Sequence, residues 1–310
     1  MNDTVKKATR ESYGEALASL GEKYDFLVLD ADLAGATKTS TFKKAFPDRH
    51  IDCGIAESNM TGIAAGIATT GKTVFISSFA MFAAGRNFEQ VRNSIGYPHL
   101  NVKIGATHAG ITVGEDGATH QCLEDIALMR TIPGMKVIVP ADDIEAKACV
   151  EAAINYEGPV YMRFGRAAVP VIYDENYVFD MDKAVVVREG KDITIAACGV
   201  CVASALEAAE KLAADGIDAE VINFHTIKPL DKDTLIASAS KTGRVFTVEE
   251  HSVIGGLGGA VCEVLSEENP VKVTKIGVND VFGQSGPAKE LMKFYGLDGE
   301  GVYNKIKESL

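Results

Sequence analysis

Short apolar runs alternate with segments of helical periodicity through residues 4–166, and this alternation limits the possible folds more than any other feature. The runs have the length and the β-branched or aromatic content of buried strands. They read FLVLD, IDCG, TVFIS, VKIGATH, KVIVP and PVYMRF. The segments between them predict helices at residues 4–20, 58–70, 85–95, 121–130 and 143–155. Strands and helices that alternate in this way form a mostly parallel sheet covered on both faces.

The alternation stops after Arg166, in a stretch without helical period that contains the turn-forming letters DEN and is typical of a linker. It then resumes with the strand-like runs ITIAACG, AEVINF, VFTVEE and VKVTKIGV and with helices predicted at 202–214, 232–238 and 255–265. At 310 residues, the chain also exceeds the usual size of one hydrophobic core. We therefore expect an α/β protein with two parallel-sheet, three-layer domains, at 1–168 and 187–310, and a linker at 169–186.

The net charge of −12 disfavours nucleic acid or an anionic membrane as a partner over a broad surface. An anionic small substrate remains compatible with it, provided that a few Arg and His side chains converge. The N-terminal residues lack the apolar core of a secretory signal. The longest apolar run, 63–85, is interrupted by Lys72, so no membrane span is expected. Six scattered Cys indicate a reducing, cytoplasmic location.

The stretch GIAESNMTGIAAGIATTG, residues 54–71, contains a single charged residue, Glu57. One interpretation is a carboxylate in the first turn of a helix, where the helix dipole stabilises it by about 0.3–1 kcal/mol. The other interpretation starts from the small residues that follow, because they allow a second backbone to approach closely. A carboxylate kept out of bulk water at such an interface would accept a proton well from a ring nitrogen.

Three aromatic side chains, Phe79, Phe82 and Phe88, follow the strand TVFIS in the segment SFAMFAAGRNFEQVR. A loop at this point would meet the carboxyl edge of the sheet, where open α/β sheets bind ligands. For any one of these residues, packing in the core is the simpler explanation. Two Phe three residues apart, followed by Gly85 and Arg86, would also make a platform for a flat heterocycle.

The segment THAGITVGEDGATHQ, residues 107–121, gathers two His, a Glu, an Asp and several Gly after a strand. A loop so rich in titratable groups favours a binding function over a purely solvated loop. His108 and His120 are too far apart for a helical metal motif, and no pair of Cys supports them, so a metal site is not expected. GEDG matches neither a dinucleotide-binding fingerprint nor a phosphate-binding P-loop.

Two further motifs carry weaker signals. CGVC, at Cys198 and Cys201, lies between a predicted strand and a helix, where a redox dithiol would lie, although buried small residues explain it better. VIGGLGGAV, residues 253–261, resembles a nucleotide-binding loop only loosely, and close packing of a helix on a sheet explains its glycines equally well.

Taken in order, a series of motifs resembles the pyrimidine-binding domain of transketolases, and the later α/β segment resembles their C-terminal domain. The motifs are ATRESYGEAL, DADL, TSTF, GIAESNMTGIAAG, SSFAMF, GATHAGITVGEDGATHQ and RFGRAAVP. The resemblance covers nearly the whole chain. The diphosphate-binding GDG motif of complete transketolases, with an Asn about thirty residues later, has no counterpart. The chain therefore resembles the C-terminal subunit of a split transketolase.

The resemblance implies a cofactor, thiamine diphosphate, whose pyrimidine half this chain would bind. Glu57 would bond a pyrimidine ring nitrogen and thereby activate the cofactor, and Phe79 and Phe82 would stack on the ring, with Phe88 a weaker candidate. A separate N-terminal transketolase subunit would bind the diphosphate together with Mg²⁺ or Ca²⁺, and this chain itself would hold no metal. The assembly would be an α2β2 heterotetramer.

The resemblance also assigns residues to a sugar phosphate substrate. Arg10, Ser40, His108 and Arg166 match positions that hold the phosphate, although TSTF with Ser40 lies four residues farther from Asp32 than in some relatives. Asp116 and His120 would bond sugar hydroxyls and assist proton transfer, and Asp32 would lie near the substrate channel. The implied catalytic residues are Glu57, His108, Asp116 and His120. The implied reaction moves a two-carbon ketol unit from a ketose phosphate to an aldose phosphate.

Several alternatives remain at this point. The beta subunit of a 2-oxo-acid dehydrogenase has the same two-domain plan and the same missing motif, although GEDGATHQ with Arg166 favours sugar phosphates. Deoxyxylulose-phosphate synthase shares part of the loop motif but is ordinarily one chain. A non-catalytic assembly subunit and a thiol-redox module belong to different classes. The C-terminal domain is expected to serve mainly subunit contacts, and His225 and His251 are expected to be structural.

Overall fold

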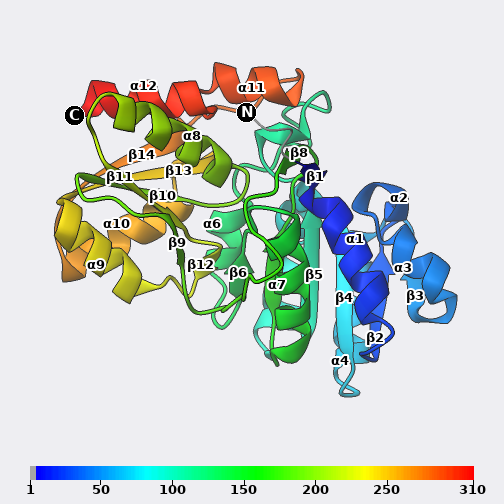
Figure 1. The fold of residues 1–310 in the computed structure, drawn as a ribbon. Helices are drawn as coiled ribbons and strands as arrows, with labels where there is room; N and C mark the ends of the chain where they lie inside the picture. The colour runs from blue at the N-terminus through cyan, green and yellow to red at the C-terminus, as the bar shows by residue number, and fades with distance from the viewer. Residues whose placement is uncertain (1–4) are drawn as a thin grey trace.

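The larger of two main sheets has seven strands, six of them between residues 26 and 163, in the computed structural model, which describes residues 5–310 (Figure 1). In spatial order its strands are β12 (Thr226–Lys228), β6 (Lys136–Ile138), β7 (Val160–Arg163), β5 (Val102–Thr107), β4 (Thr73–Phe79), β2 (Phe26–Asp30) and β3 (His50–Asp52). All neighbours pair in parallel except β12, which pairs antiparallel with β6. Since β12 follows the linker, the second half of the chain extends the sheet of the first.

Helices cover both faces of this sheet, as the alternating sequence predicts. Apolar side chains on one face pack against α1 (Thr9–Leu20), α3 (Ser40–Ala45) and α7 (Asp143–Asn155). The other face packs against α4 (Glu57–Ala68), α6 (Asp125–Arg130) and two π-helical turns, Met81–Arg86 and Val91–Gly96, with α5 (Phe88–Gln90) between them. The remaining short elements are α2 (Ala34–Thr37) and 3-10 turns at Pro47–Arg49 and Ile111–Val113.

The second sheet has five strands and its own helical layers. In spatial order the strands are β14 (Lys272–Val278), β13 (Arg244–Ser252), β10 (Ile193–Ala197), β11 (Ala219–Asn223) and β9 (Val185–Arg188). The pairs are parallel except for the edge strand β9, which is antiparallel to β11. The helices are α8 (Cys201–Ala214), α9 (Lys232–Thr242), α10 (Leu257–Glu268), α11 (Ala288–Phe294) and α12 (Gly299–Ser309).

Between the two sheets, residues 171–184 form neither helix nor strand. The chain enters this segment from β8 (Ala168–Pro170), which pairs antiparallel with β1 (Lys6–Ala8) in a separate two-stranded sheet. Asp142, the N-cap of α7, fixes the start of the segment, because one carboxylate oxygen accepts hydrogen bonds from the backbone N–H groups of Ile172 and Tyr173 at 2.8 and 2.9 Å.

Most predicted elements are present, and the differences have physical causes. The strand at 26–30 and the helix at 143–155 are confirmed to the residue. The helix predicted from residue 4 begins only at Thr9, because residues 6–8 pair with β8; Thr4 lies outside the described residues. The helix predicted at 85–95 is wrong as a regular helix, since π-helical turns occupy most of it. Strands β9 and β12 and helices α11 and α12 were not expected from the sequence.

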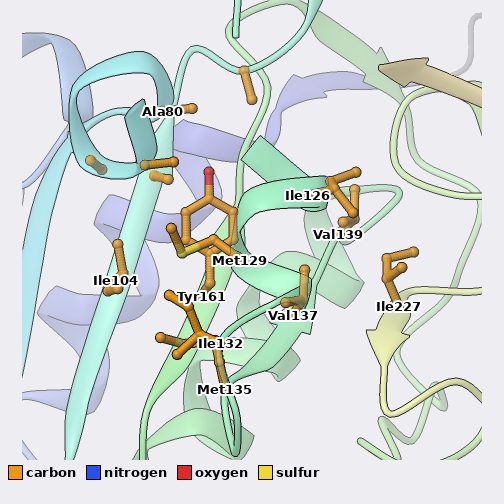
Figure 2. Close-up of a cluster of buried hydrophobic side chains, with 14 of the residues drawn as sticks. Ala80, Ile104, Ile126, Met129, Ile132, Met135, Val137, Val139, Tyr161 and Ile227 are labelled. Atoms are coloured by element: carbon orange, nitrogen blue, oxygen red, sulfur yellow. The ribbon is translucent and has the colours of Figure 1, made fainter. Parts of the chain in front are cut away.

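The fold class is confirmed as two α/β units with mostly parallel sheets. One hydrophobic core is continuous from the larger sheet into the smaller one and includes side chains of α6, β7, β11 and α10. Figure 2 shows a part of it, where Tyr161 of β7 lies among Ile104, Met129 and neighbouring apolar side chains, with Ile227 of β12 to one side. None of the helices in residues 5–310 has the length and apolarity that crossing a bilayer requires.

A buried ionic cluster also joins the two units. Arg163, at the end of β7, donates from Nε to Asp125 of α6 at 2.8 Å, and its NH1 lies 3.6 Å from a carboxylate oxygen of Glu250 on β13. Arg163 also donates from NH2 to the backbone oxygens of Cys122 and Glu250. All three side chains are buried, so each charge depends on its partners rather than on water.

We expect Arg163→Met to destabilise the chain strongly, because two carboxylates would remain buried without a cation. Removing one partner of a buried ion pair typically costs about 3–5 kcal/mol. The measurement is the free energy of unfolding by urea, followed by circular dichroism. The matched control is Lys23→Met, which removes an exposed pair with Glu151 and should leave the midpoint nearly unchanged. Equal midpoints for both variants would contradict the structural role of the cluster.

Candidate functional site at the carboxyl edge of the larger sheet

Four of the residues singled out from the sequence lie at the carboxyl ends of four neighbouring parallel strands. Asp32 follows β2, Phe79 ends β4, His108 follows β5 and Arg166 follows β7. Phe79 belongs to the strand itself, which corrects the expectation of a loop at this position. Because parallel strands all end at the same edge of their sheet, segments far apart in sequence meet there. The sheet alone therefore accounts for most of the convergence.

Glu57 is the first residue of α4, and its side chain is only 3% exposed. One carboxylate oxygen, Oε2, accepts a hydrogen bond from NH1 of Arg86 at 3.1 Å. Within residues 5–310, Oε1 accepts no hydrogen bond. Arg86 was noted in the sequence as following Phe79 and Phe82, but it was not assigned to the site and its pairing with Glu57 was not predicted. A lone cation at the end of an otherwise apolar turn was the only available signal.

Aromatic rings form a cluster beside this carboxylate. Phe79 and Phe82 lie nearly parallel, with ring centroids 6.0 Å apart, and the rings of His120 and Phe82 meet in a T-shaped arrangement with centroids 5.5 Å apart. The guanidinium of Arg86 lies over Phe82, 4.6 Å from the ring centroid. Phe88 does not join these rings within the described residues, because its side chain packs against the core. The structure thus gathers Phe79 and Phe82 but places Phe88 apart.

His108 is buried between an aromatic ring and a cation. Its ring stacks on Phe79 with centroids 3.8 Å apart, and its Nε2 lies 3.0 Å from NH1 of Arg10. A guanidinium can only donate, so Nε2 of His108 accepts this hydrogen bond. The proton of the neutral ring is therefore on Nδ1, which donates to the hydroxyl oxygen of Thr107 at 2.9 Å. Burial, followed by the charges of Arg10 and Arg166, lowers the pKa of His108 from 6.5 to about 3.

Arg166 lies against the loop that contains GEDG. Its NH1 donates to the backbone oxygen of Val113 and to the carboxylate of Glu115 at 3.2 Å, and lies 3.9 Å from the carboxylate of Asp116. Arg10 contacts His108 directly, and the pKa of Arg10 is lowered by burial and by the charge of Arg166. Two guanidinium groups close enough to influence each other thus supply positive charge in an acidic chain.

Asp32 and Ser40 lie on the segment that follows β2 but make no hydrogen bond with the ring cluster in the part of the chain that is described. The backbone N–H of Asp32 donates to Asp52 at 3.1 Å, and Asp32 has a positive φ of 59°. Ser40 begins α3 and is half-buried. Buried Asp30 organises this segment, since it accepts hydrogen bonds from the hydroxyls of Thr37 and Thr39 and from a backbone N–H. Asp30 was not singled out from the sequence.

The weaker motifs have structural roles. Cys198 and Cys201 are buried, and burial raises the pKa of both thiols well above the ordinary range, which opposes redox chemistry. A side chain at Gly256 would collide with the buried carboxylate of Glu249. This carboxylate accepts hydrogen bonds from the backbone N–H groups of Leu257 and Gly258 at the start of α10. His225 and His251 are buried in contacts with neighbouring residues.

Two regions of the sequence match known protein families. Residues 5–171 match the family described as "Transketolase, pyrimidine binding domain", and residues 182–302 match "Transketolase, C-terminal domain". The chain belongs to the transketolase family. The expected family resemblance is thereby confirmed.

Individual relatives agree with this assignment. A protein of Methanocaldococcus jannaschii named "Putative transketolase C-terminal section" is 52% identical over 310 residues, which cover 99% of this chain and 97% of that protein. Transketolase of Mus musculus is 40% identical over 307 residues, which cover 97% of this chain but only 49% of the mouse protein. A solved structure described as "Split gene transketolase, inactive beta4 tetramer" has a TM-score of 0.89 at 53% identity and covers 97% of each chain.

The transketolase family implies thiamine diphosphate and a divalent metal, and the geometry at this edge suits one part of that cofactor. A flat heterocycle requires an aromatic surface and a polar group in its plane. Phe79 and Phe82 offer the surface, and Glu57 offers a nearly buried carboxylate with one oxygen free of partners among the described residues. The side chains thus fit the pyrimidine end. Residues 5–310 contain no group of three or more His, Cys, Asp or Glu placed to hold a metal ion.

We expect His108 to stay neutral in the folded chain down to about pH 4, because its pKa is held at about 3. Ring resonances of labelled histidine followed over a pH titration measure this. Arg10→Gln should raise the midpoint of this titration, since one of the charges that lower the pKa of His108 is removed.

Unfolded histidine binds a proton near pH 6.5, so the buried, neutral ring of His108 should lower the free energy of unfolding progressively as the pH falls from 6.5 towards 3. A folded-state midpoint near 6.5 would contradict the buried, Arg-paired ring.

We expect alkylation of the native chain at about pH 8 to modify Cys53 and Cys262, which are half-buried, well before the four buried thiols. Burial raises the pKa of Cys198 and Cys201 and also blocks access to them. Peptide mass spectrometry after timed quenching gives the order of reaction. Early modification of Cys198 or Cys201 would return the redox interpretation to consideration.

Proposed function

We propose that this chain is the C-terminal subunit of a two-chain transketolase that moves a two-carbon ketol unit from a ketose phosphate to an aldose phosphate. The observation that carries the proposal is the position of Glu57, a nearly buried carboxylate beside Phe79 and Phe82 at the carboxyl edge of a parallel sheet. Family membership gives this arrangement its chemical meaning. Thiamine diphosphate, when bound, supplies the carbon centre that stabilises negative charge in such reactions.

Glu57 would hold the proton of the pyrimidine nitrogen at Oε1, the oxygen that accepts no hydrogen bond within residues 5–310. Arg86 fixes the other oxygen at 3.1 Å, so the carboxylate has one orientation. Little water reaches it, which strengthens a hydrogen bond to a ring nitrogen. Phe79 and Phe82 would confine the ring by stacking. These residues bind and orient the pyrimidine end and place a proton acceptor in its plane.

The substrate would lie on the other side of the rings, where Arg10, His108 and Arg166 converge. Arg10 and Arg166 offer donor geometry suited to phosphate. Neutral His108 would act as a hydrogen-bonding group rather than as a charge. Asp116 is exposed and His120 half-buried, which leaves both accessible to sugar hydroxyls and to proton transfer. Asp32 and Ser40, which lie outside the ring cluster, would contribute at the mouth of the site.

The site would be completed by an N-terminal transketolase subunit that binds the diphosphate and Mg²⁺ or Ca²⁺. The surface of α4 supports a close subunit contact. Gly62 and Gly66 are exposed, and a Cβ added to either would meet no atom within 4 Å. Ile55 and Ile63 are also exposed on or beside this helix. Neither glycine is required by packing within this chain, and the lack of a side chain at both positions would allow the backbone of another subunit to approach α4 closely. The match to half of a full-length transketolase supports the same partner and an α2β2 assembly.

The test uses the chain co-purified with its N-terminal subunit, supplied with thiamine diphosphate, Mg²⁺, xylulose 5-phosphate and an aldose phosphate. We expect Glu57→Gln to lower kcat by about 10²–10⁴-fold, the range that positioned proton transfer contributes. The variant should also bind thiamine diphosphate more weakly by calorimetry, because a charge-assisted hydrogen bond is lost. The matched control is Glu263→Gln, an exposed carboxylate on α10 that should leave kcat within about twofold of the original.

Two outcomes would overturn the proposal. Full ketol transfer by Glu57→Gln would show that this carboxylate serves no catalytic purpose. Pyruvate decarboxylation by the original complex, without ketol transfer, would instead support the beta subunit of a 2-oxo-acid dehydrogenase.

A further inference from the structure

We propose that the C-terminal domain holds the substrate loop of the first domain in its working shape, and that Gln121 is the positioning residue of this contact. The substrate loop is defined here as residues 110–121, which include Asp116 and His120. This inference rests on the proposed function, because it concerns residues assigned there to the substrate. It gives the C-terminal domain a task within the site, beyond the subunit contacts expected from the sequence.

Gln121 ties three backbone carbonyls together with one amide group. Its Nε2 lies within hydrogen-bond distance of the oxygens of Ile111 at 3.2 Å, Gly114 at 3.4 Å and Gln284 at 2.9 Å, so its two N–H groups serve three acceptors and one of them is shared. Since all three neighbours are carbonyl oxygens, the amide atom that faces them must be the donor nitrogen and not the oxygen, which fixes the orientation of the Gln121 amide. Two of the carbonyls lie on the substrate loop, and the third lies in the segment between β14 and α11. Gln121 is buried, so water does not compete for these bonds.

The segment 283–286 of the C-terminal domain packs along the substrate loop. The hydroxyl of Ser285 donates to the backbone oxygen of Glu115 at 2.6 Å, next to Asp116. A Cβ on Gly117 would lie 3.4 Å from Ser285, and a Cβ on Gly114 would lie 3.4 Å from the oxygen of Gly286. On the opposite side, a Cβ on Gly283 would collide with the amide of Gln121. The two segments are therefore in contact along several residues on each side.

A second contact fixes the beginning of the loop. Glu250 of β13 accepts hydrogen bonds from the N–H and the hydroxyl of Thr112 at 3.0 and 2.9 Å. Gly110 has a positive φ of 75°, and a Cβ at this position would collide with Glu250. The same carboxylate belongs to the buried cluster with Arg163. The loop is thus anchored at both ends by the C-terminal domain, with Asp116 and His120 between the anchors.

The geometry has a kinetic consequence. Asp116 is exposed, and Arg166 makes the nearest charged contact to it, at 3.9 Å. Its position therefore depends on the backbone of the loop more than on side-chain packing. A displacement of about 1 Å in a catalytic geometry can cost about 10²-fold in rate. Loosening the contact between Gln121 and Gln284 should accordingly affect the substrate more than thiamine diphosphate, since Glu57 and the Arg86 that orients it both lie on other elements.

The experiment compares Gln121→Met, which keeps the length of the side chain but removes the donor, with Ser285→Ala. In the complex with the N-terminal subunit, Gln121→Met should lower kcat/KM for xylulose 5-phosphate by about 10–100-fold. Ser285→Ala should lower it by about 2–10-fold, as expected for one hydrogen bond. Complex formation and thiamine diphosphate affinity should stay within about twofold of the original, which a general loss of structure would not allow. The matched control is Ser266→Ala, which removes a comparable bond from an exposed serine to the carbonyl of Glu263.

Hydrogen exchange in the isolated chain gives a readout without catalysis. Amides of residues 112–120 should exchange at least about threefold faster in both test variants, and at unchanged rates in Ser266→Ala. Unchanged exchange together with unchanged kcat/KM in Ser285→Ala and Gln121→Met would overturn the inference. If Gln121→Met does not fold, Ser285→Ala decides alone. If the original complex transfers no ketol unit, the proposed function fails, and the exchange measurement still shows whether the C-terminal domain positions the loop.

Discussion

Arg163 holds a full positive charge where water does not reach it, and its position ties three parts of the molecule together. It ends a strand of the larger sheet, pairs with Asp125 of α6, and lies 3.6 Å from a carboxylate oxygen of Glu250 in the second sheet. Each of these charges is neutralised only by the others. Separating the two units would therefore leave buried charges without a partner or expose them to water. Glu250 also accepts two hydrogen bonds from Thr112. The interaction that joins the domains therefore also fixes the beginning of the loop beside the site.

Much of the site was predictable from sequence because parallel strands end at a common edge. The strands FLVLD, TVFIS, VKIGATH and PVYMRF predict that residues at or just after their ends lie close together. Phe79 does stack on His108, and Arg166 is near enough for its charge to lower the pKa of His108. The pairing of Arg86 with Glu57 and the separation of Phe88 from the rings were not predictable, since they depend on an irregular, π-helical backbone. No side-chain period in the sequence reveals that irregularity.

The second half of the chain was predicted less fully, for a different reason. Strand β12 has only three residues and pairs with a sheet built far earlier in sequence, so its existence depends on domain docking rather than on local pattern. Helix α11 has only seven residues, of which Leu291 alone is buried, so its apolar pattern is weak. Helix α12 has eleven residues and buries Val302 and Ile306 four positions apart, so its helical spacing was present in the sequence and was missed. The sequence does not show that the segment between β14 and α11 packs on the substrate loop. For that reason, only subunit contacts were expected of the C-terminal domain.

The charge of the site follows from burial as much as from composition. A chain with a net charge of −12 needs local cations to attract a phosphate, and histidine is often invoked for that purpose. Here burial and Arg10 keep His108 neutral, with a pKa of about 3, so the ring adds no charge near neutral pH. Arg10 and Arg166 remain as the sources of positive charge, and guanidinium groups do not titrate in that range. The positive charge that the site offers to an anionic substrate would consequently be almost independent of pH. Any pH dependence of turnover would arise from the groups that move protons and from the substrate phosphate, whose second pKa is about 6.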